Sequence, residues 1–165
     1  MTDPSLASSP RWQPWVGLVA RLVLGGVLLV AGALKVGNLG ESVNAVRGYQ
    51  LLPWALTTPV GYALPIIEIV VGLLLVVGLF TRWAALAGSL LMAAFIIGIG
   101  SAWARGIAID CGCFGGGGAI ALEAALAAYP WEIARDVGLL LCGLWLVWRP
   151  RTPLALHDRL FPPLP

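Results

Sequence analysis

Long apolar runs alternate with polar stretches along this chain, and four of the runs have the length of a membrane-crossing helix. The runs cover Trp15 to about Leu34, Pro59 to about Phe80, Trp83 to about Trp103, and Trp131 to Trp148. A helix needs roughly 20 predominantly apolar residues to cross a bilayer. The pattern therefore predicts an all-α fold, a polytopic membrane four-helix bundle.

The first polar connection, Lys35 to Thr58, is long enough to hold structure of its own. Its middle, Leu39 to Gln50, suits a short helix lying at the membrane interface. Thr58 and Pro59 favour a helix start, because a capping hydroxyl is followed by proline at the first helical position. Pro65 lies inside the second apolar run, where proline is expected to kink a helix.

Two further connections separate the later runs. Thr81 and Arg82 predict a tight turn, and Ala104 to about Pro130 predicts a long loop. The alanine-rich stretch Ala119 to Ala128 suits a short helix within that loop. The loop also carries Cys111-Gly112-Cys113, so the sequence places a Cys-Gly-Cys loop between helices 3 and 4 of the bundle.

The two ends of the chain are polar or proline-punctuated. Residues 1–14 predict a disordered N-terminal tail, residues 15–149 a single four-span membrane domain, and residues 150–165 a proline-rich C-terminal tail. The first apolar run is too long for the hydrophobic region of a signal peptide, and Arg21 interrupts it. We therefore expect it to be retained as a span.

Composition supports a membrane location. The chain has 165 residues, of which 59% are hydrophobic and 11% charged, and its mean hydropathy is +0.90. A soluble domain of this length covers its surface with more charged residues than this. The lipid bilayer is therefore an expected partner, whereas a net charge of +2, scattered along the chain, does not suggest nucleic acid.

Tryptophans and glycines agree with the division into four spans. Tryptophans at both ends of the spans are typical of the aromatic belts at membrane interfaces, and glycines inside spans let helices approach closely. One belt would hold Trp15, Trp83, Trp145 and Trp148, the other Trp54, Trp103 and Trp131, and the glycines within spans are Gly25, Gly26, Gly32, Gly72, Gly88, Gly98, Gly138 and Gly143.

Basic residues give the expected orientation. Cytoplasmic loops carry an excess of Lys and Arg, and the side that holds both termini is slightly the richer. The sequence thus predicts an inner or plasma membrane protein with both termini cytoplasmic. The Cys-Gly-Cys loop is then extracytoplasmic, where disulfides persist. The two sets are Arg11, Arg82, Arg149, Arg151 and Arg159 on the terminal side, and Lys35, Arg47, Arg105 and Arg135 on the other.

Cys111 and Cys113 are the main candidates for chemistry. Two thiols one residue apart close a disulfide ring of about eleven atoms, small enough to bend the bond from its preferred geometry. A strained and exposed disulfide is easily reduced, which suits exchange, and Gly112 can adopt the positive φ that such a ring needs. The four glycines after Phe114 are expected to keep the loop flexible and open to a partner. Three interpretations stay open: a redox dithiol, a loop with a merely structural disulfide or idle thiols, and handling of a thiolate-binding metal.

Glu68 is the main intramembrane candidate, since a carboxylate in a span usually faces the bundle interior with a partner. Arg21 and Lys35 on the first span flank its depth, and either side chain is long enough to reach it. The pair would serve either as a buried ion pair that fixes helix packing, or as a proton relay or a contact for a quinone headgroup.

Arg135 and Asp136 open the predicted fourth span, close to the loop. They would either be solvated at the helix start or steady the loop, and Arg135 would favour the reactive thiolate. Cys142 lies near mid-membrane and is expected to pack as a small hydrophobe, while His157 lies in the C-terminal tail. A structural zinc site needs about four ligands, which the loop does not offer.

Several of these features together resemble the MauE branch of the DoxX-like membrane proteins. They are a lysine closing the first span, a glutamate followed by Gly72 and an apolar run in the second, and a Cys-Gly-Cys-Phe-Gly loop before the fourth. The resemblance covers about residues 15 to 149. It implies a redox-associated protein linked to methylamine utilisation, with Cys111 and Cys113 as the redox pair and Lys35, Glu68, Arg135 and Asp136 as recurrent polar positions.

The resemblance also implies a thioredoxin-fold partner outside the cytoplasm. The main hypothesis is therefore thiol-disulfide exchange with such a partner, which leaves open whether the chain is itself an enzyme or a component of one. No cofactor is required by the sequence, and a quinone near Glu68 is the one cofactor considered. The rivals are a non-catalytic membrane anchor or assembly subunit of a redox complex and a thiolate-based metal carrier.

Overall fold

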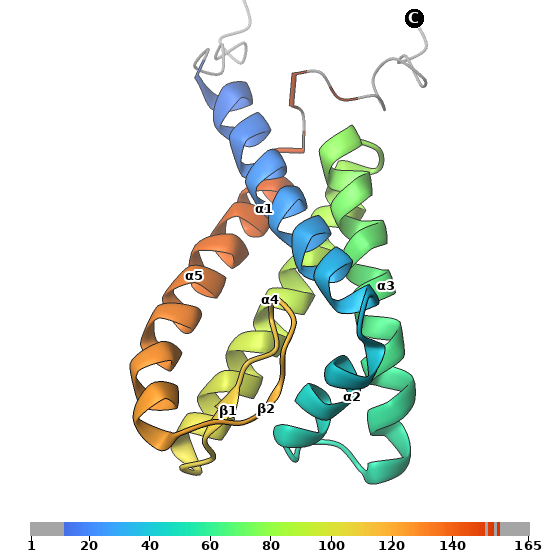
Figure 1. Ribbon diagram of the computed structural model, residues 1–165. Coiled ribbons are helices and arrows are strands. Elements are labelled where there is room, and N and C mark those ends of the chain that lie inside the picture. Colours follow the sequence, from blue (N-terminus) through green and yellow to red (C-terminus); the bar gives the residue numbers. More distant parts are fainter. Residues whose placement is uncertain (1–11, 151, 154, 156–165) are drawn as a thin grey trace, which may run out of the picture.

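The computed structural model describes residues 12–150, 152, 153 and 155, and it is mostly helical, as predicted (Figure 1). The predicted tails lie largely outside this part of the chain, except that Gln13 and Pro14 belong to the first helix. The elements are α1 (Gln13–Val36), α2 (Leu39–Gly48), α3 (Trp54–Val77), α4 (Thr81–Ala104), β1 (Ile109–Asp110), β2 (Gly118–Ala119) and α5 (Leu122–Trp148).

Four long helices run up and down, and the small elements gather at one end of them (Figure 1). α1 packs mainly on α3, and α4 mainly on α5, while α1 also touches α5. The short helix α2 packs against α3 and against β1 and β2, which pair antiparallel. The start of α1 and the end of α5 lie at the opposite end (Figure 1).

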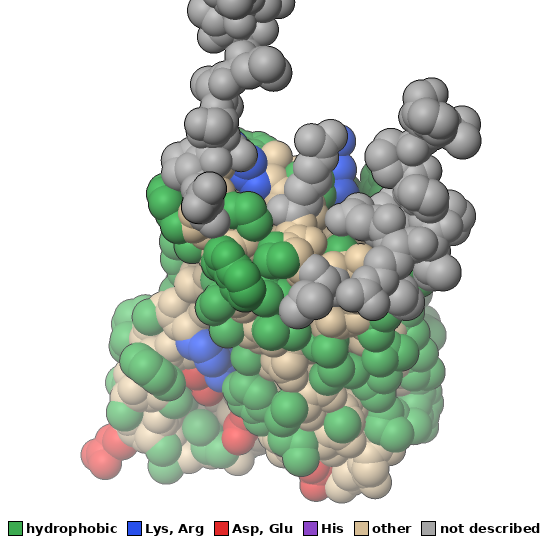
Figure 2. All heavy atoms as spheres, turned by 90° about the horizontal axis from the view of Figure 1, so that it is seen from above, with side chains coloured by type: hydrophobic (Ala, Val, Ile, Leu, Met, Phe, Trp, Pro, Cys, Tyr) green, Lys and Arg blue, Asp and Glu red, His purple; other side chains and the backbone are tan. Residues whose placement is uncertain are grey.

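Length and composition allow three of the helices to cross a membrane. These are α1, α3 and α4, each of 24 residues. α5 has 27 residues, but its apolar half, from Trp131 onward, contains Glu132, Arg135 and Asp136. Seen from above, apolar side chains cover much of the visible surface and charged ones are few (Figure 2). The chain is therefore a membrane protein.

Glycines bring α1 and α3 together. A Cβ at Gly25 would lie 3.0 Å from the carbonyl oxygen of Gly72, and one at Gly72 would lie 2.8 Å from that of Gly25. Gly32 meets α3 about two turns further along α1, where a Cβ would be 3.1 Å from that of Glu68. The predicted role in close approach is confirmed here, but it is wrong for Gly26 and Gly138, which have nothing within 4 Å.

Two helix starts differ from the sequence prediction. α3 begins at Trp54, after the extended Pro53, so Thr58 and Pro59 lie inside the helix rather than at its start. α5 begins at Leu122 and continues through Pro130, because the alanine-rich stretch favours helix and one proline removes only one backbone hydrogen bond. The predicted short helix and fourth span are thus one helix.

The connection between α3 and α4 lies earlier than expected. Gly78 ends α3 in the left-handed conformation, with φ +76°, and Phe80 precedes α4 with φ +48°. Thr81 and Arg82 are already helical, so the turn lies at residues 78–80, just before the position that the sequence predicted. The short helix predicted within Leu39 to Gln50 is confirmed as α2.

Candidate functional site

The Cys-Gly-Cys segment follows α4 and lies between β1 and β2 (Figure 1). Both cysteines are buried, Cys111 at 9% and Cys113 at 5% exposure, among Ile99, Ala125 and Tyr129. The expectation of an exposed and open loop is therefore wrong. The glycines fit the loop against α2, since a Cβ at Gly112 or Gly117 would lie 2.6 Å from the Cβ of Ala45.

Local hydrogen bonds shape the turn between the thiols. Asp110 Oδ1 accepts a hydrogen bond of 2.8 Å from the Gly112 amide, and the Cys113 amide donates to Cys111 Sγ over 3.3 Å. Gly112 has φ +66°, the left-handed conformation that the sequence predicted for it. The two sulfur atoms belong to a single tight turn and are free thiols in this structure.

Two tyrosines that the sequence did not single out hold this segment. Tyr129 of α5 is 1% exposed; its hydroxyl donates to the Ile107 carbonyl at 2.7 Å and accepts from the Ile109 amide at 3.0 Å. The Tyr49 hydroxyl donates to the Cys111 carbonyl at 2.9 Å. Burial raises the pKa of Tyr49, so this hydroxyl remains a donor.

Replacing Tyr129 with phenylalanine is expected to loosen the start of the cysteine segment. The change leaves the Ile109 amide buried without a partner, which costs about 1–3 kcal/mol of unfolding free energy. Tyr62→Phe on the exposed face of α3 is the matched control and should cost less than about 0.5 kcal/mol. Denaturant unfolding in detergent, followed by tryptophan fluorescence, measures both, and equal stability of the two variants would contradict the expectation.

Lys35 and Glu68 form the buried ion pair that the sequence anticipated. Glu68 is 0% exposed, and Lys35 Nζ donates to its two carboxylate oxygens at 2.6 and 2.9 Å. Arg21, the alternative partner, instead donates to Thr152 at the other end of α1. A fully paired buried charge is the arrangement that a membrane interior tolerates.

Arg135 and Asp136 lie in the middle of α5 rather than at its start, because that helix begins earlier than predicted. Their side chains form an ion pair of 2.8 Å. The Arg135 guanidinium also lies 4.9 Å from the centre of the Phe114 ring and interacts with the Cys113 thiol. These contacts join the pair to the cysteine segment, and its role in steadying the loop stays a prediction.

The predicted polar residues therefore meet in one place. Glu68, Cys113, Arg135 and Asp136 line one small cavity inside the bundle. Lys35 reaches it through its bond to Glu68, and its charge acts on Asp136 as well. Cys113 thus sits beside two cation–carboxylate pairs drawn from α1, α3 and α5.

The environment of Cys111 is different. The adjoining Cys113 side chain and burial raise the pKa of Cys111, and hydrogen bonding to Glu132 raises it further. Glu132, which the sequence left without a role, lies near the Cys111 thiol, and its buried Oε2 has no hydrogen-bond partner among the described residues. Cys111 is consequently held as a neutral thiol, while Cys113 shares its cavity with the Arg135 cation.

The other candidates lie apart from this site. Cys142 sits on α5 about five and a half turns from its start and packs against the hydrophobic core formed by α1, α3, α4 and α5, as expected of a small hydrophobe. His157, Arg11, Arg151 and Arg159 fall outside the described residues. Within the part of the chain that the structure describes, no group of three or more His, Cys, Asp or Glu side chains is placed to hold a metal ion.

Comparison with known proteins gives one consistent match. The family model described as methylamine utilisation protein MauE matches residues 13–149. The chain is similar to "Methylamine utilization protein MauE" of Methylorubrum extorquens, with 33% identity over 82% of this chain and 70% of that protein. It is also similar to the protein of the same name from Paracoccus denitrificans, with 32% identity over 64% of this chain. The chain spans 57% of the length of that relative, and no solved structure matches.

Proposed function

The chain belongs to the MauE family, and from this premise we propose that it serves methylamine utilisation by exchanging disulfides with a thioredoxin-fold partner outside the cytoplasm. The relatives' names supply the process. The observation that carries the chemistry is the placement of the two thiols, Cys113 beside the Arg135 cation and Cys111 beside the Glu132 carboxylate. The wider DoxX-like relationship stays a prediction.

The proposed exchange assigns a different role to each cysteine. In the disulfide form, a partner thiolate attacks Cys111 Sγ, the S–S bond breaks, and Cys113 leaves as a thiolate beside Arg135. A leaving thiolate that is stabilised departs faster. The second thiolate of the partner then attacks the mixed disulfide and releases Cys111, which takes up a proton through Glu132. Two electrons have passed from the partner to this chain.

A trapping experiment tests this assignment. Cells producing Cys113→Ala are quenched with acid, alkylated and analysed without reductant, beside Cys111→Ala. We expect a larger, reductant-sensitive band that is stronger for Cys113→Ala. In the reverse of the exchange, the Cys111 thiolate attacks the disulfide of the oxidised partner, and the Cys113 that would break the resulting mixed disulfide is gone. Absence of the band from both variants, with a pair that is always oxidised in the unmodified protein, would refute exchange.

Orientation in the membrane is part of the proposal. We place the end of the bundle that holds β1 and β2 outside the plasma membrane and both termini in the cytoplasm. This agrees with the start of α1 and the end of α5 lying at the end of the bundle opposite to β1 and β2 (Figure 1). Single cysteines at the exposed positions Ile120 and Arg82, introduced into a cysteine-free chain, report the two ends. Labelling of Ile120→Cys but not Arg82→Cys by an impermeant reagent is expected, and the reverse would invert the topology.

The rival role as a non-catalytic anchor of a redox complex is favoured by one observation, the burial of both thiols. An anchor would co-purify with its partner after loss of both cysteines, and would yield no mixed disulfide. Exchange requires the loop to open briefly so that a partner can reach Cys111. The same trapping experiment therefore separates the two roles.

A further inference from the structure

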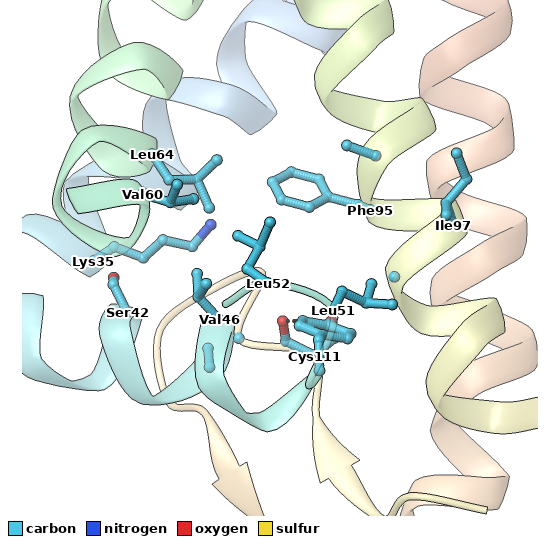
Figure 3. Close-up of a pocket in the computed structure, with 15 residues that line it drawn as sticks. Lys35, Ser42, Val46, Leu51, Leu52, Val60, Leu64, Phe95, Ile97 and Cys111 are labelled. Carbon is cyan, nitrogen blue, oxygen red and sulfur yellow. Dashed lines mark hydrogen bonds between the residues drawn. The ribbon is translucent and has the colours of Figure 1, made fainter. Parts of the chain in front are cut away.

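A second and larger cavity lies on the other side of Lys35. Its volume is about 360 Å³, within the range of about 300–1,000 Å³ usual for small-molecule sites. It is enclosed by α2, by the segment that follows α2, by α3 and by α4 (Figure 3). Apolar side chains form most of its wall, among them Val46, Leu52, Leu64 and Phe95 (Figure 3).

The cavity reaches the surface that faces lipid. Leu51, Leu52 and Ile97 belong to its lining and are 49%, 39% and 67% exposed. Both α3 and α4, which supply the upper wall, are helices able to cross a membrane. A molecule dissolved in the bilayer could therefore enter the cavity sideways, without passing through water.

The polar groups in the cavity are few and point to a ligand with an acceptor oxygen. The Lys35 ammonium projects into it (Figure 3), and two of the three ammonium hydrogens are used by Glu68. Ser42 is 3% exposed, and its Oγ has no hydrogen-bond partner among the residues that the structure describes. A buried hydroxyl without a partner is costly unless something else completes it.

Cys111 and Gly112 form part of the same wall, so the cavity touches the dithiol turn. We infer that the cavity binds a membrane quinone, with a ring carbonyl accepting hydrogen bonds from Lys35 and Ser42 and with the tail lying toward the lipid. This site differs from the one the sequence suggested, since Glu68 is occupied by Lys35 and faces the smaller cavity.

The inference rests on the proposed exchange, because a dithiol reduced by its partner must lose two electrons before it can react again. In the quinone step the S–H bond of Cys111 breaks and an S–S bond forms between Cys111 and the Cys113 thiolate. The quinone takes up the two electrons, the proton of Cys111 and one proton from water, and becomes a quinol. Atoms and electrons balance, and the disulfide form is restored.

Binding is tested with ubiquinone-1 and the full-length protein whose two loop cysteines are changed to serine, so that no reaction occurs. We expect saturable quenching of tryptophan fluorescence, weakened at least tenfold in affinity by Ala94→Trp, which fills the cavity from α4. Ala63→Trp, also exposed but outside the cavity, is the matched control and should leave affinity unchanged. Ser42→Ala should weaken affinity about fivefold through loss of one hydrogen bond.

Reaction is tested with the reduced, unmodified protein under anaerobic conditions. Quinol formation should match thiol loss one for two, and Ala94→Trp should raise the KM for ubiquinone-1 without changing exchange with the partner. Geraniol, an isoprenoid without the ring, is the second probe, and its binding as tightly as ubiquinone-1 would overturn the inference in favour of a lipid chain. Exchange without quinone binding refutes this inference alone, whereas quinone binding without exchange refutes the proposed function alone.

Discussion

Changing both Cys111 and Cys113 to alanine is expected to abolish disulfide exchange with the partner completely. The reaction passes through bonds to these two sulfur atoms, and no other side chain near them can replace a thiolate. Both residues are small and buried, so alanine should leave the helices in place. The measurement is the rate at which a reduced thioredoxin-fold partner becomes oxidised in membranes that contain the variant.

Cys142→Ala is the matched control, since this cysteine lies on α5 and packs against the core between the four long helices, away from the loop. It should retain the full rate of exchange. If the double variant also kept a rate close to that of the unmodified protein, the loop cysteines would not be the redox pair. If only Cys142→Ala lost the exchange activity, the reactive cysteine would be Cys142, inside the helix bundle.

Changing Lys35 to methionine is expected to destabilise the fold by about 3–5 kcal/mol, the usual effect of removing one partner from a buried ion pair. Glu68 is 0% exposed and receives two hydrogen bonds from Lys35, so its charge would be left without compensation. Thermal unfolding in detergent, followed through the fluorescence of the eight tryptophans, measures the effect.

The combined variant Lys35→Met with Glu68→Gln tests the cause. Removing both charges should recover most of the loss, because a neutral pair carries no uncompensated buried charge. A combined variant that is as unstable as Lys35→Met alone would mean that packing around Lys35, such as its contact with the Phe95 ring, dominates instead.

The pairing of Lys35 with Glu68 shows how far the sequence leads. From the sequence, the expected depths of these residues in the membrane left Arg21 and Lys35 as the candidate partners of Glu68. The structure selects Lys35 because α1 and α3 cross where Gly32 lies opposite Glu68, one turn from Lys35. Such a crossing point depends on which glycines meet a neighbour, and Gly26 shows that a glycine inside a span is not sufficient evidence of one.

The environment of the cysteines was harder to predict. The glycines after Phe114 suggested an open loop, yet Gly117 is needed for close contact with Ala45, and glycine composition does not distinguish mobility from close packing. Tyr129 and Ser42 were missed for a related reason. Each is one polar residue on a helix, and only the packing of other elements against it makes its hydroxyl a loop support or an unpaired donor.

The contact of Ala45 with Gly112 and Gly117 has a mechanical consequence. The cysteine turn packs against α2, and α2 also forms one wall of the larger cavity. A displacement of α2 away from the bundle would widen the cavity and uncover the thiols in a single movement. The same helix would then control the access of lipid-soluble molecules to the cavity and the access of a protein partner to the thiols. A change in one kind of access would therefore change the other.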